Sequence, residues 1–188
     1  MNKVYFEFAK LDETEDIMSF ISIHWNDKHI FTISKELFMK EFLWLERPDM
    51  LTIGLTKDQL GQILGIFCFK FFNYSKIPDL TGSIWKVTPD AENQYHMIGY
   101  RLRQFVIDNV QYRFFSAPGP TLETKSIYTM LRYQWNQMKQ YYLINPLIDD
   151  YKLIKFPIRN VQSSIDKKKS NILLKKIQNI EELNDFDF

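Results

Sequence analysis

The sequence has little of what disulfides, metal sites and membrane spans require. Cys68 is its one cysteine, which excludes an internal disulfide and any cysteine-rich metal site. The three histidines, at positions 24, 29 and 96, lack the close spacing of metal ligands, so we expect no bound metal. No apolar run approaches the roughly 18 residues of a membrane span, and the N-terminus has no apolar signal core. These absences predict a soluble, cytoplasmic protein without membrane contacts.

Net charge is also small. The chain carries 24 lysines and arginines against 23 acidic residues, for a formal charge of +1, so we expect no nucleic-acid partner. Hydrophobic residues, in contrast, make up 45% of the chain and aromatic residues 16%. This content excludes disorder of the whole chain, and 188 residues suit one ordinary domain with some length left over.

Strand-like and helix-like segments alternate along the chain. Helices are predicted from about residues 12, 34, 99 and 121, with Asp12 and Glu15 as a capping box and Ser34 and Thr121 as N-caps. Residues 73–81 and the polar stretch after Pro89 are predicted loops. Strands are predicted at 3–9, 51–56, 62–72, 83–87, 112–116 and 137–144. The resulting order is strand, two helices, three strands, helix, strand, helix, strand.

The stretch from Gly82 to Phe105 organises this pattern. Its strand should stop at Pro89, which cannot donate a ladder hydrogen bond. Past Gly99, apolar residues recur at helical spacing, so the motif is a strand, a loop and a helix with a glycine at the helix start. Such a turn offers unpaired N–H groups and the positive end of a helix dipole to an anion. The motif therefore predicts a cofactor that bears phosphate.

At these residues the chain resembles the GNAT superfamily of acyl-CoA-dependent N-acetyltransferases. Val87-Thr88-Pro89 matches the family's Val-x-Pro. Residues 94–99 match its Gln/Arg-x-x-Gly-x-Gly/Ala loop, except that Met97 replaces the first glycine and the preceding loop is longer than usual. Residues 126–133 resemble the family's Leu-Tyr-x-x-Leu-Gly-Phe segment, with Arg132 in place of the glycine. The resemblance covers about residues 3–145.

The resemblance implies an α/β (α+β) fold: a mixed, mostly antiparallel sheet with helices on both faces and a splayed fourth and fifth strand pair. Acetyl-CoA, or another acyl-CoA, would bind between these two strands. The implied cofactor-binding residues are Trp85, Lys86, Val87, Gln94, Tyr95, His96, Met97, Ile98, Gly99 and Tyr100. Tyr128 falls where the family places its general acid. No base is evident; the candidates are His29, His96, Asp90, Glu92 and a chain of water molecules.

A narrower resemblance concerns residues 24–30 and 36–38. They are similar to a GNAT-like branch encoded among bacterial surface-polysaccharide genes. This implies that His24, Trp25 and His29 bind the acceptor, a small amine such as an amino sugar of polysaccharide biosynthesis. The plainer alternative is that His24 and Trp25 end an amphipathic helix and pack on the sheet. A homodimer is left open.

The end of the chain suggests a second, incomplete repeat. Residues 176–186 can be laid over residues 10–20 without a gap. We therefore expect a GNAT-like domain at 1–158, followed by a linker and the possible start of another domain at 159–188. Two alternatives to an N-acyltransferase follow. One is a non-catalytic binding module, because the Met97 side chain narrows the approach to the phosphate loop. The other is the first half of a tandem GNAT transferase.

Overall fold

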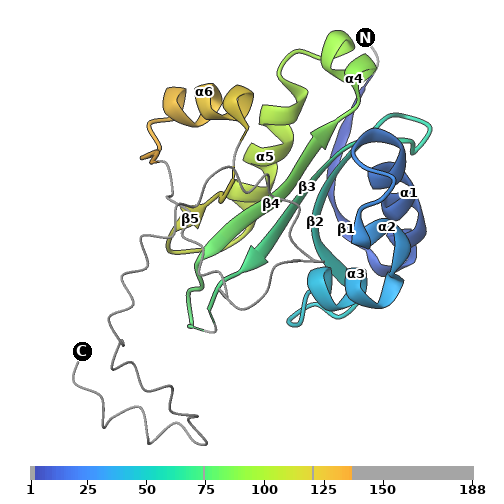
Figure 1. Ribbon diagram of the computed structural model, residues 1–188, viewed down its shortest axis with the longest axis horizontal. Helices are drawn as coiled ribbons and strands as arrows, with labels where there is room; N and C mark the ends of the chain where they lie inside the picture. The colour runs from blue at the N-terminus through green and yellow to red at the C-terminus, as the bar shows by residue number, and fades with distance from the viewer. Residues whose placement is uncertain (1–2, 74, 120, 137–188) are drawn as a thin grey trace, which may run out of the picture. The chain divides into compact units, whose positions relative to one another are not determined.

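The computed structural model describes residues 3–73, 75–119 and 121–136, which form a sheet covered by helices (Figure 1). Five strands lie in the order β1-β2-β3-β4-β5. Their bounds are β1 Tyr5–Lys10, β2 Met50–Lys57, β3 Ile63–Phe71, β4 Leu80–Val87 and β5 Phe115–Ser116. The first four strands are antiparallel to their neighbours, whereas β5 is parallel to β4. This confirms the predicted fold class.

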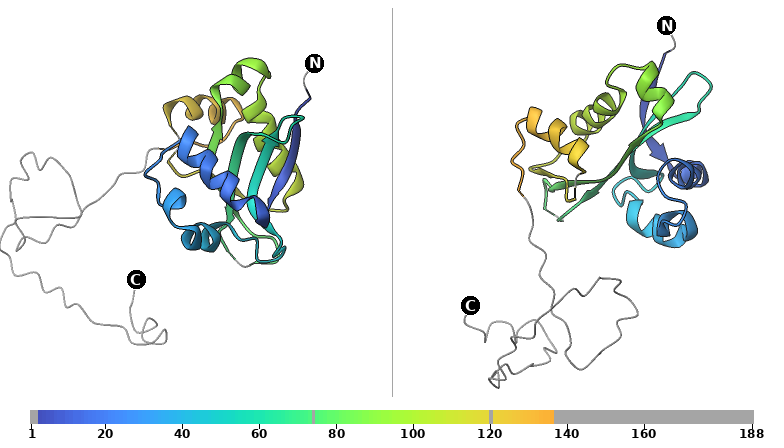
Figure 2. Two further views of the ribbon diagram at one scale, coloured as in Figure 1. Left: turned by 90° about the vertical axis from the view of Figure 1, so that its right-hand side faces the viewer. Right: turned by 45° about the horizontal axis from the view of Figure 1, so that its top comes forward.

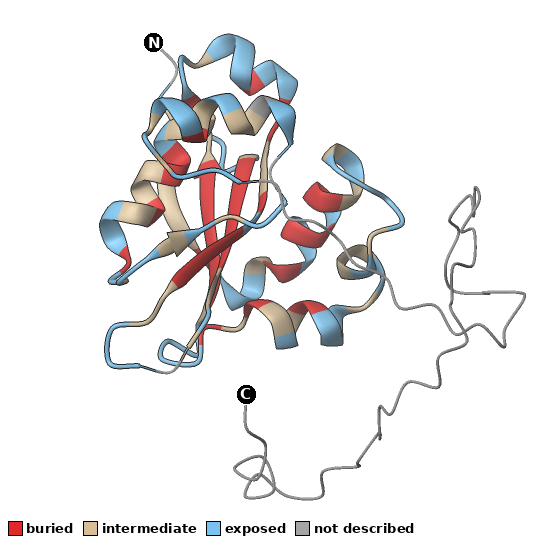
Figure 3. Ribbon diagram, turned by 60° about the vertical axis from the view of Figure 1, so that its left-hand side comes forward, coloured by how far each residue is buried: buried red, intermediate tan, exposed pale blue. Residues whose placement is uncertain are grey.

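Helices cover both faces of the sheet (Figures 1 and 2). On one face lie η1 Leu11–Glu13, α1 Thr14–His24, α2 Ile30–Ile33 and α3 Lys35–Phe42; α5 Ile98–Asn109 covers the other face, α6 Leu122–Met130 lies near α5, and α4 Pro89–Gln94 follows β4. In strand β3, alternate side chains pack against the helices on opposite faces of the sheet. Ile66 and Cys68 pack toward α1 and α3, and Phe67 and Phe69 toward α5. The central strands are therefore buried on both faces (Figure 3).

Local details differ from the sequence-based expectation in four places. Strand β4 begins at Leu80, inside the predicted loop, and β5 is only two residues long. The predicted polar loop after Pro89 is the short helix α4, because Thr88 accepts a hydrogen bond from Ala91 N (3.3 Å) and Pro89 suits the first helical position. The predicted capping box is also wrong. Glu13, rather than Glu15, accepts from the backbone, at Lys10 N (2.8 Å).

Three further expectations concern the C-terminal part of the chain. The predicted strand at 137–144, the domain boundary at 158 and the repeat at 176–186 lie outside the described residues. Among the residues that the structure does describe, no helix has the length and apolar character needed to cross a bilayer.

Strands β4 and β5 pair only at one end. Leu80 pairs with Phe115 and Thr81 with Ser116. Just before this ladder, Arg113 holds Asp79 with two hydrogen bonds, Nε to Oδ1 (3.0 Å) and Nη2 to Oδ2 (2.9 Å). From residue 82 to 87 this edge of β4 has no strand partner in the described part of the chain. The predicted splay is confirmed.

A β-bulge explains the separation of the two strands. Trp85 pairs with Phe67 and Gly82 with Phe69, so β4 advances three residues while β3 advances two. A bulge bends its strand and increases the local twist. Because this one follows directly after the last residue paired with β5, it turns the rest of β4 away from β5. An edge of backbone N–H and C=O groups is left open.

Candidate functional site

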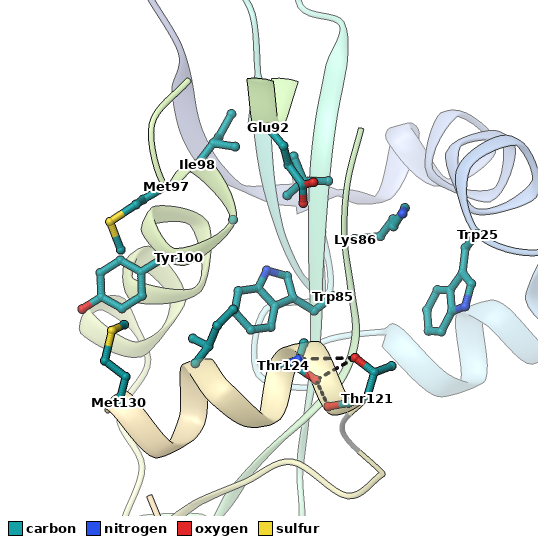
Figure 4. Close-up of a pocket in the computed structure, with 13 residues that line it drawn as sticks. Trp25, Trp85, Lys86, Glu92, Met97, Ile98, Tyr100, Thr121, Thr124 and Met130 are labelled. Carbon is teal, nitrogen blue, oxygen red and sulfur yellow. Dashed lines mark hydrogen bonds between the residues drawn. The ribbon is translucent and has the colours of Figure 1, made fainter. Parts of the chain in front are cut away.

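A cavity of about 690 Å³ lies beside the open edge of β4 (Figure 4). Trp85 stands at its centre, with Met97, Tyr100 and Met130 on one side and Trp25 on the other. Its lining comes from β4, α4, the start of α5, one face of α6, and Trp25 after α1. The residues are Trp25, Trp85, Lys86, Val87, Glu92, Met97, Ile98, Gly99, Tyr100, Thr121, Thr124, Ile127 and Met130.

The first turn of α5 presents free backbone donors to this cavity. Met97, the N-cap, has φ 52° and ψ 32°, the left-handed conformation that glycine adopts most easily. Arg101 N donates to Met97 O (2.9 Å), the first i to i−4 bond of the helix. In the described part of the chain, the N–H groups of Gly99 and Tyr100 donate to no backbone carbonyl. This turn can therefore receive an anion.

Gly99 also lets α5 approach β4 closely. A Cβ atom at this position would lie 3.3 Å from Val87 Cγ2 and 3.4 Å from Trp85 Nε1, both of which line the cavity. A methyl group would be tight there, and a longer side chain would have to extend among the lining residues. The glycine thus keeps space open beside the free N–H groups.

Helix α6 forms the opposite wall. Thr121 caps it by accepting a hydrogen bond from Thr124 N (3.3 Å). Thr121, Thr124, Ile127 and Met130 recur every three residues and all line the cavity. Met130 is 62% exposed, whereas Tyr128 is buried because its ring packs against rings from β4 and β5.

The Tyr128 ring borders a smaller cavity of about 120 Å³, farther back along β4. Gly82 and Ser83 line this cavity too, at the bulge. Trp25, Trp85, Thr121 and Thr124 line both cavities. The two therefore form one cleft along the open β4 edge. We call the part beside the first turn of α5 the helix end, and the part beside Tyr128 and Ser83 the inner end.

Tyr128 is held by aromatic contacts and is neutral at physiological pH. Its ring stacks on Phe115 (centroids 6.3 Å apart) and meets Trp85 edge-on (6.2 Å). Burial raises the pKa of its phenol above the usual value of about 10, while the positive charge of Arg103 and its hydrogen bonding act in the opposite direction. The net pKa is raised, so the hydroxyl keeps its proton and can donate it.

The histidines do not gather at the cleft. His29 Nδ1 accepts a hydrogen bond from Phe31 N (3.2 Å), which caps α2. In neutral imidazole the proton then sits on Nε2, so the outer nitrogen is a donor and no free lone pair remains for a base. The His29 ring stacks on Trp25 (5.8 Å) and supports that indole. His96 is exposed and lines none of the cavities described above.

A separate cavity of about 490 Å³ holds several of the predicted residues. His24, Asp90, Gln94 and Tyr95 line it, together with the β2–β3 turn. The predicted cofactor loop is therefore divided: Met97, Ile98, Gly99 and Tyr100 face the cleft with Trp85, Lys86 and Val87, whereas Gln94 and Tyr95 face the other cavity. The intervening α4, which the sequence analysis took for a loop, causes this division.

Sequence reasoning missed most of the α6 wall. Thr121, Thr124, Ile127 and Met130 were not predicted as site residues. Their three-residue spacing from a capping threonine was a readable signal of one helix face. It could not show that this face lines a cleft, because that depends on where α6 packs.

The arrangement of strands and helices resembles that of solved acetyltransferase structures. Aminoglycoside antibiotic 6'-N-acetyltransferase AAC(6')-Ih from Acinetobacter baumannii is similar over 76% of this chain and 99% of its own, with a TM-score of 0.57 and 12% identity. Aminoglycoside N-acetyltransferase AAC(6')-Iy in complex with CoA is similar over 77% of this chain and 96% of its own, with a TM-score of 0.57 and 13% identity. An acetyltransferase from Trypanosoma brucei is similar over 76% of this chain and 100% of its own, with a TM-score of 0.53 and 8% identity.

At these identities the likeness establishes the fold alone. No protein-family model matches the sequence, and no curated protein matches it.

Proposed function

We propose that this protein is an acyl-CoA-dependent N-acyltransferase, with acetyl-CoA as donor and a small amine as acceptor. One observation carries the proposal: the unpaired edge of β4 and the free N–H groups of Gly99 and Tyr100 line the same cleft. The structural likeness to acetyltransferases, one of them in complex with CoA, supports it.

The shape and chemistry of the cleft fit such a donor. An extended chain that contains amides can add to the open β4 edge as a further strand would. A pyrophosphate can bind the free N–H groups at the start of α5, near the positive end of the helix dipole. Lys86 also lines the cleft and adds positive charge. The thioester would then lie at the inner end, beside Tyr128.

The donor supplies an activated acyl carbonyl, and the chain supplies position and a proton. The amine nitrogen forms a bond to the carbonyl carbon as the carbon–sulfur bond breaks, and the sulfur leaves with the electron pair. The neutral Tyr128 hydroxyl can give this sulfur its proton. None of the four side-chain candidates for a base lines the inner end. The amine therefore loses its proton to water, which the hydroxyls of Ser83, Thr121 and Thr124 can hold there.

The acceptor would enter past Trp25. This indole is 46% exposed and lines both parts of the cleft, and His29 stacks on it. A rigid aromatic wall of this kind suits a flat or ring-shaped acceptor. An amino sugar fits that description and agrees with the narrower sequence resemblance. His24 would be a peripheral contact, because it lines the neighbouring cavity.

Calorimetry on the full chain with acetyl-CoA and with free CoA tests the donor site. We expect saturable one-to-one binding of both, with a dissociation constant in the micromolar range that is usual for enzyme substrates. Acyl transfer to a panel of amino sugars, measured by the release of free CoA thiol, tests the reaction. Absence of CoA binding by a folded sample would overturn the proposal.

Two cleft residues favour a non-catalytic binding module as the second candidate. Met97 places a side chain, 44% exposed, where the resemblance implies glycine. Glu92 places a carboxylate in the cleft toward the start of α5, where a pyrophosphate would bind (Figure 4). Binding without any acyl transfer would favour this candidate. The tandem-transferase alternative depends on residues 137–188, outside the described part.

The position of Glu92 gives a specific expectation for binding. Glu92→Gln removes one negative charge from the helix end of the cleft while keeping the side-chain volume. We expect CoA affinity to rise about threefold to tenfold at low ionic strength, because an exposed like charge is removed. The gain should shrink with added salt. Asp90→Asn is the matched control, because Asp90 lies on the same short helix but lines the other cavity. If affinity falls instead, Glu92 contributes to binding in another way.

A further inference from the structure

A buried arginine stands behind Tyr128. Arg103, on the second turn of α5, is 1% exposed. Rings from three segments surround its guanidinium carbon: Phe115 of β5 at 4.9 Å, Tyr133 at 5.1 Å and Tyr128 of α6 at 5.6 Å, measured to the ring centroids. Arg103 Nη2 donates a hydrogen bond to the Tyr133 hydroxyl (2.5 Å). Its charge therefore lies among aromatic faces and phenol oxygens.

This arrangement is costly for a purely structural side chain. Arginine keeps its charge at all relevant pH values, and burial of a charge is unfavourable unless it is paired. No carboxylate in the described part of the chain forms an ion pair with Arg103. Among the residues that the structure describes, none forms a hydrogen bond with the buried Arg103 Nε. Cation–π contacts offset part of this desolvation cost, but an apolar side chain would pack there without any desolvation cost.

The charge has a direct consequence for the phenol beside it. When Tyr128 gives up its proton, a negative phenolate forms in a site that burial makes unfavourable for charge. A fixed positive guanidinium, with its carbon 5.6 Å from the centre of the Tyr128 ring, stabilises the phenolate. Tyr112, whose phenol has its pKa raised by burial, and Tyr133 are the other phenols near Arg103. In the described part of the chain no carboxylate forms an ion pair with Arg103 that would cancel this stabilisation.

We propose that Arg103 is a positioning residue for Tyr128: it fixes the phenol at the inner end of the cleft and stabilises the phenolate left when the proton goes to the departing sulfur. This rests on the proposed function of Tyr128 as proton donor. In the step, the tyrosine O–H bond breaks and an S–H bond forms. The proton that the amine releases to water then restores the phenol, so that protons balance over one turnover.

The test replaces the cation and follows the phenol directly. Arg103→Met removes the charge and puts an unbranched apolar side chain in its place. With 3,5-difluorotyrosine at position 128, which is more acidic than tyrosine, fluorine NMR reports the titration of that one phenol. We expect its midpoint to rise by about one pH unit in Arg103→Met, a tenfold change in the proton-release equilibrium. We also expect kcat to fall about tenfold, with KM for acetyl-CoA within about twofold of the wild-type value.

The matched control is Arg101→Met. Arg101 lies on the same helix and its guanidinium also lies over an aromatic ring, that of Phe6 (5.2 Å). Unlike Arg103, it is exposed, and its ring contact is with β1 rather than with Tyr128. It should change neither the midpoint nor kcat. If Arg103→Met does not fold, Arg103→Gln decides, because it removes the charge but keeps a side chain that can donate hydrogen bonds. There we expect changes in the same directions, and unchanged values of both would overturn the proposal.

Two failures can be told apart. If the midpoint rises but no variant, including the wild type, transfers an acyl group, then Arg103 acts on Tyr128 as proposed and the proposed function is wrong. If the wild type transfers acyl groups and a folded Arg103→Met variant keeps both its midpoint and its kcat, then the role of Arg103 is wrong and the proposed function stands.

Discussion

Replacement of Tyr128 by phenylalanine should lower kcat by about a hundredfold or more, the usual range for loss of a general acid. The ring and its contacts with Phe115 and Trp85 remain, so acetyl-CoA affinity should stay within about twofold. Only the proton donor at the inner end of the cleft is lost. Steady-state kinetics with the amine acceptor, together with calorimetry of donor binding, measure the two quantities separately.

Tyr112→Phe is the control for this experiment. Tyr112 is also partly buried, and burial raises the pKa of its phenol too, but it lines none of the described cavities. Its loss should leave kcat nearly unchanged. If Tyr128→Phe turns over at the wild-type rate, Tyr128 is a packing residue, and water or another group protonates the departing sulfur.

Replacement of Gly99 by glutamate should weaken CoA binding by well over tenfold, which corresponds to more than about 1.4 kcal/mol. The new side chain would start 3.3 Å from Val87 and 3.4 Å from Trp85, so it must extend into the cleft. It also brings a negative charge next to the N–H groups that would hold the pyrophosphate. Bulk and charge therefore act in the same direction.

Two further variants separate these effects. Gly99→Gln adds nearly the same bulk without charge, and its binding loss should be smaller and insensitive to salt. Gly99→Ala adds one methyl group in a tight contact and reports the cost to folding, by melting temperature. Unchanged CoA affinity in a folded Gly99→Glu variant would exclude this turn as the phosphate site.

The sequence identified the parts of the site that are set by residues close together in the chain. The β-rich stretch before Pro89, the helical periodicity after Gly99 and the capping Thr121 each predict an element that the structure contains. It failed at α4, although Thr88 before Pro89, with acidic residues in the next turn, is a helix-start signal. Gln94 and Tyr95, which the resemblance implies as cofactor-binding residues, lie at the end of α4 or just after it and line a different cavity.

Contacts between distant segments were beyond the reach of the sequence. The bulge in β4 depends on its register with β3, and the burial of Arg103 depends on rings supplied by β5, α6 and Tyr133. A pattern of apolar residues shows which face of an element is buried, but not which partner buries it. An arginine in a helix is normally exposed, so nothing local marked Arg103 as different.

What the sequence by itself determined was the order of the strands from β1 to β5 and the helix that begins near Gly99, because capping, proline and periodicity act within a few residues. The tertiary structure alone decided that β4 turns away from β5 after Thr81, that Met97 takes a left-handed conformation at the α5 N-cap, and that Tyr128 lies between the cleft and a buried cation. These features arise from packing between segments far apart in the chain, where the free energy depends on geometry that no local pattern contains.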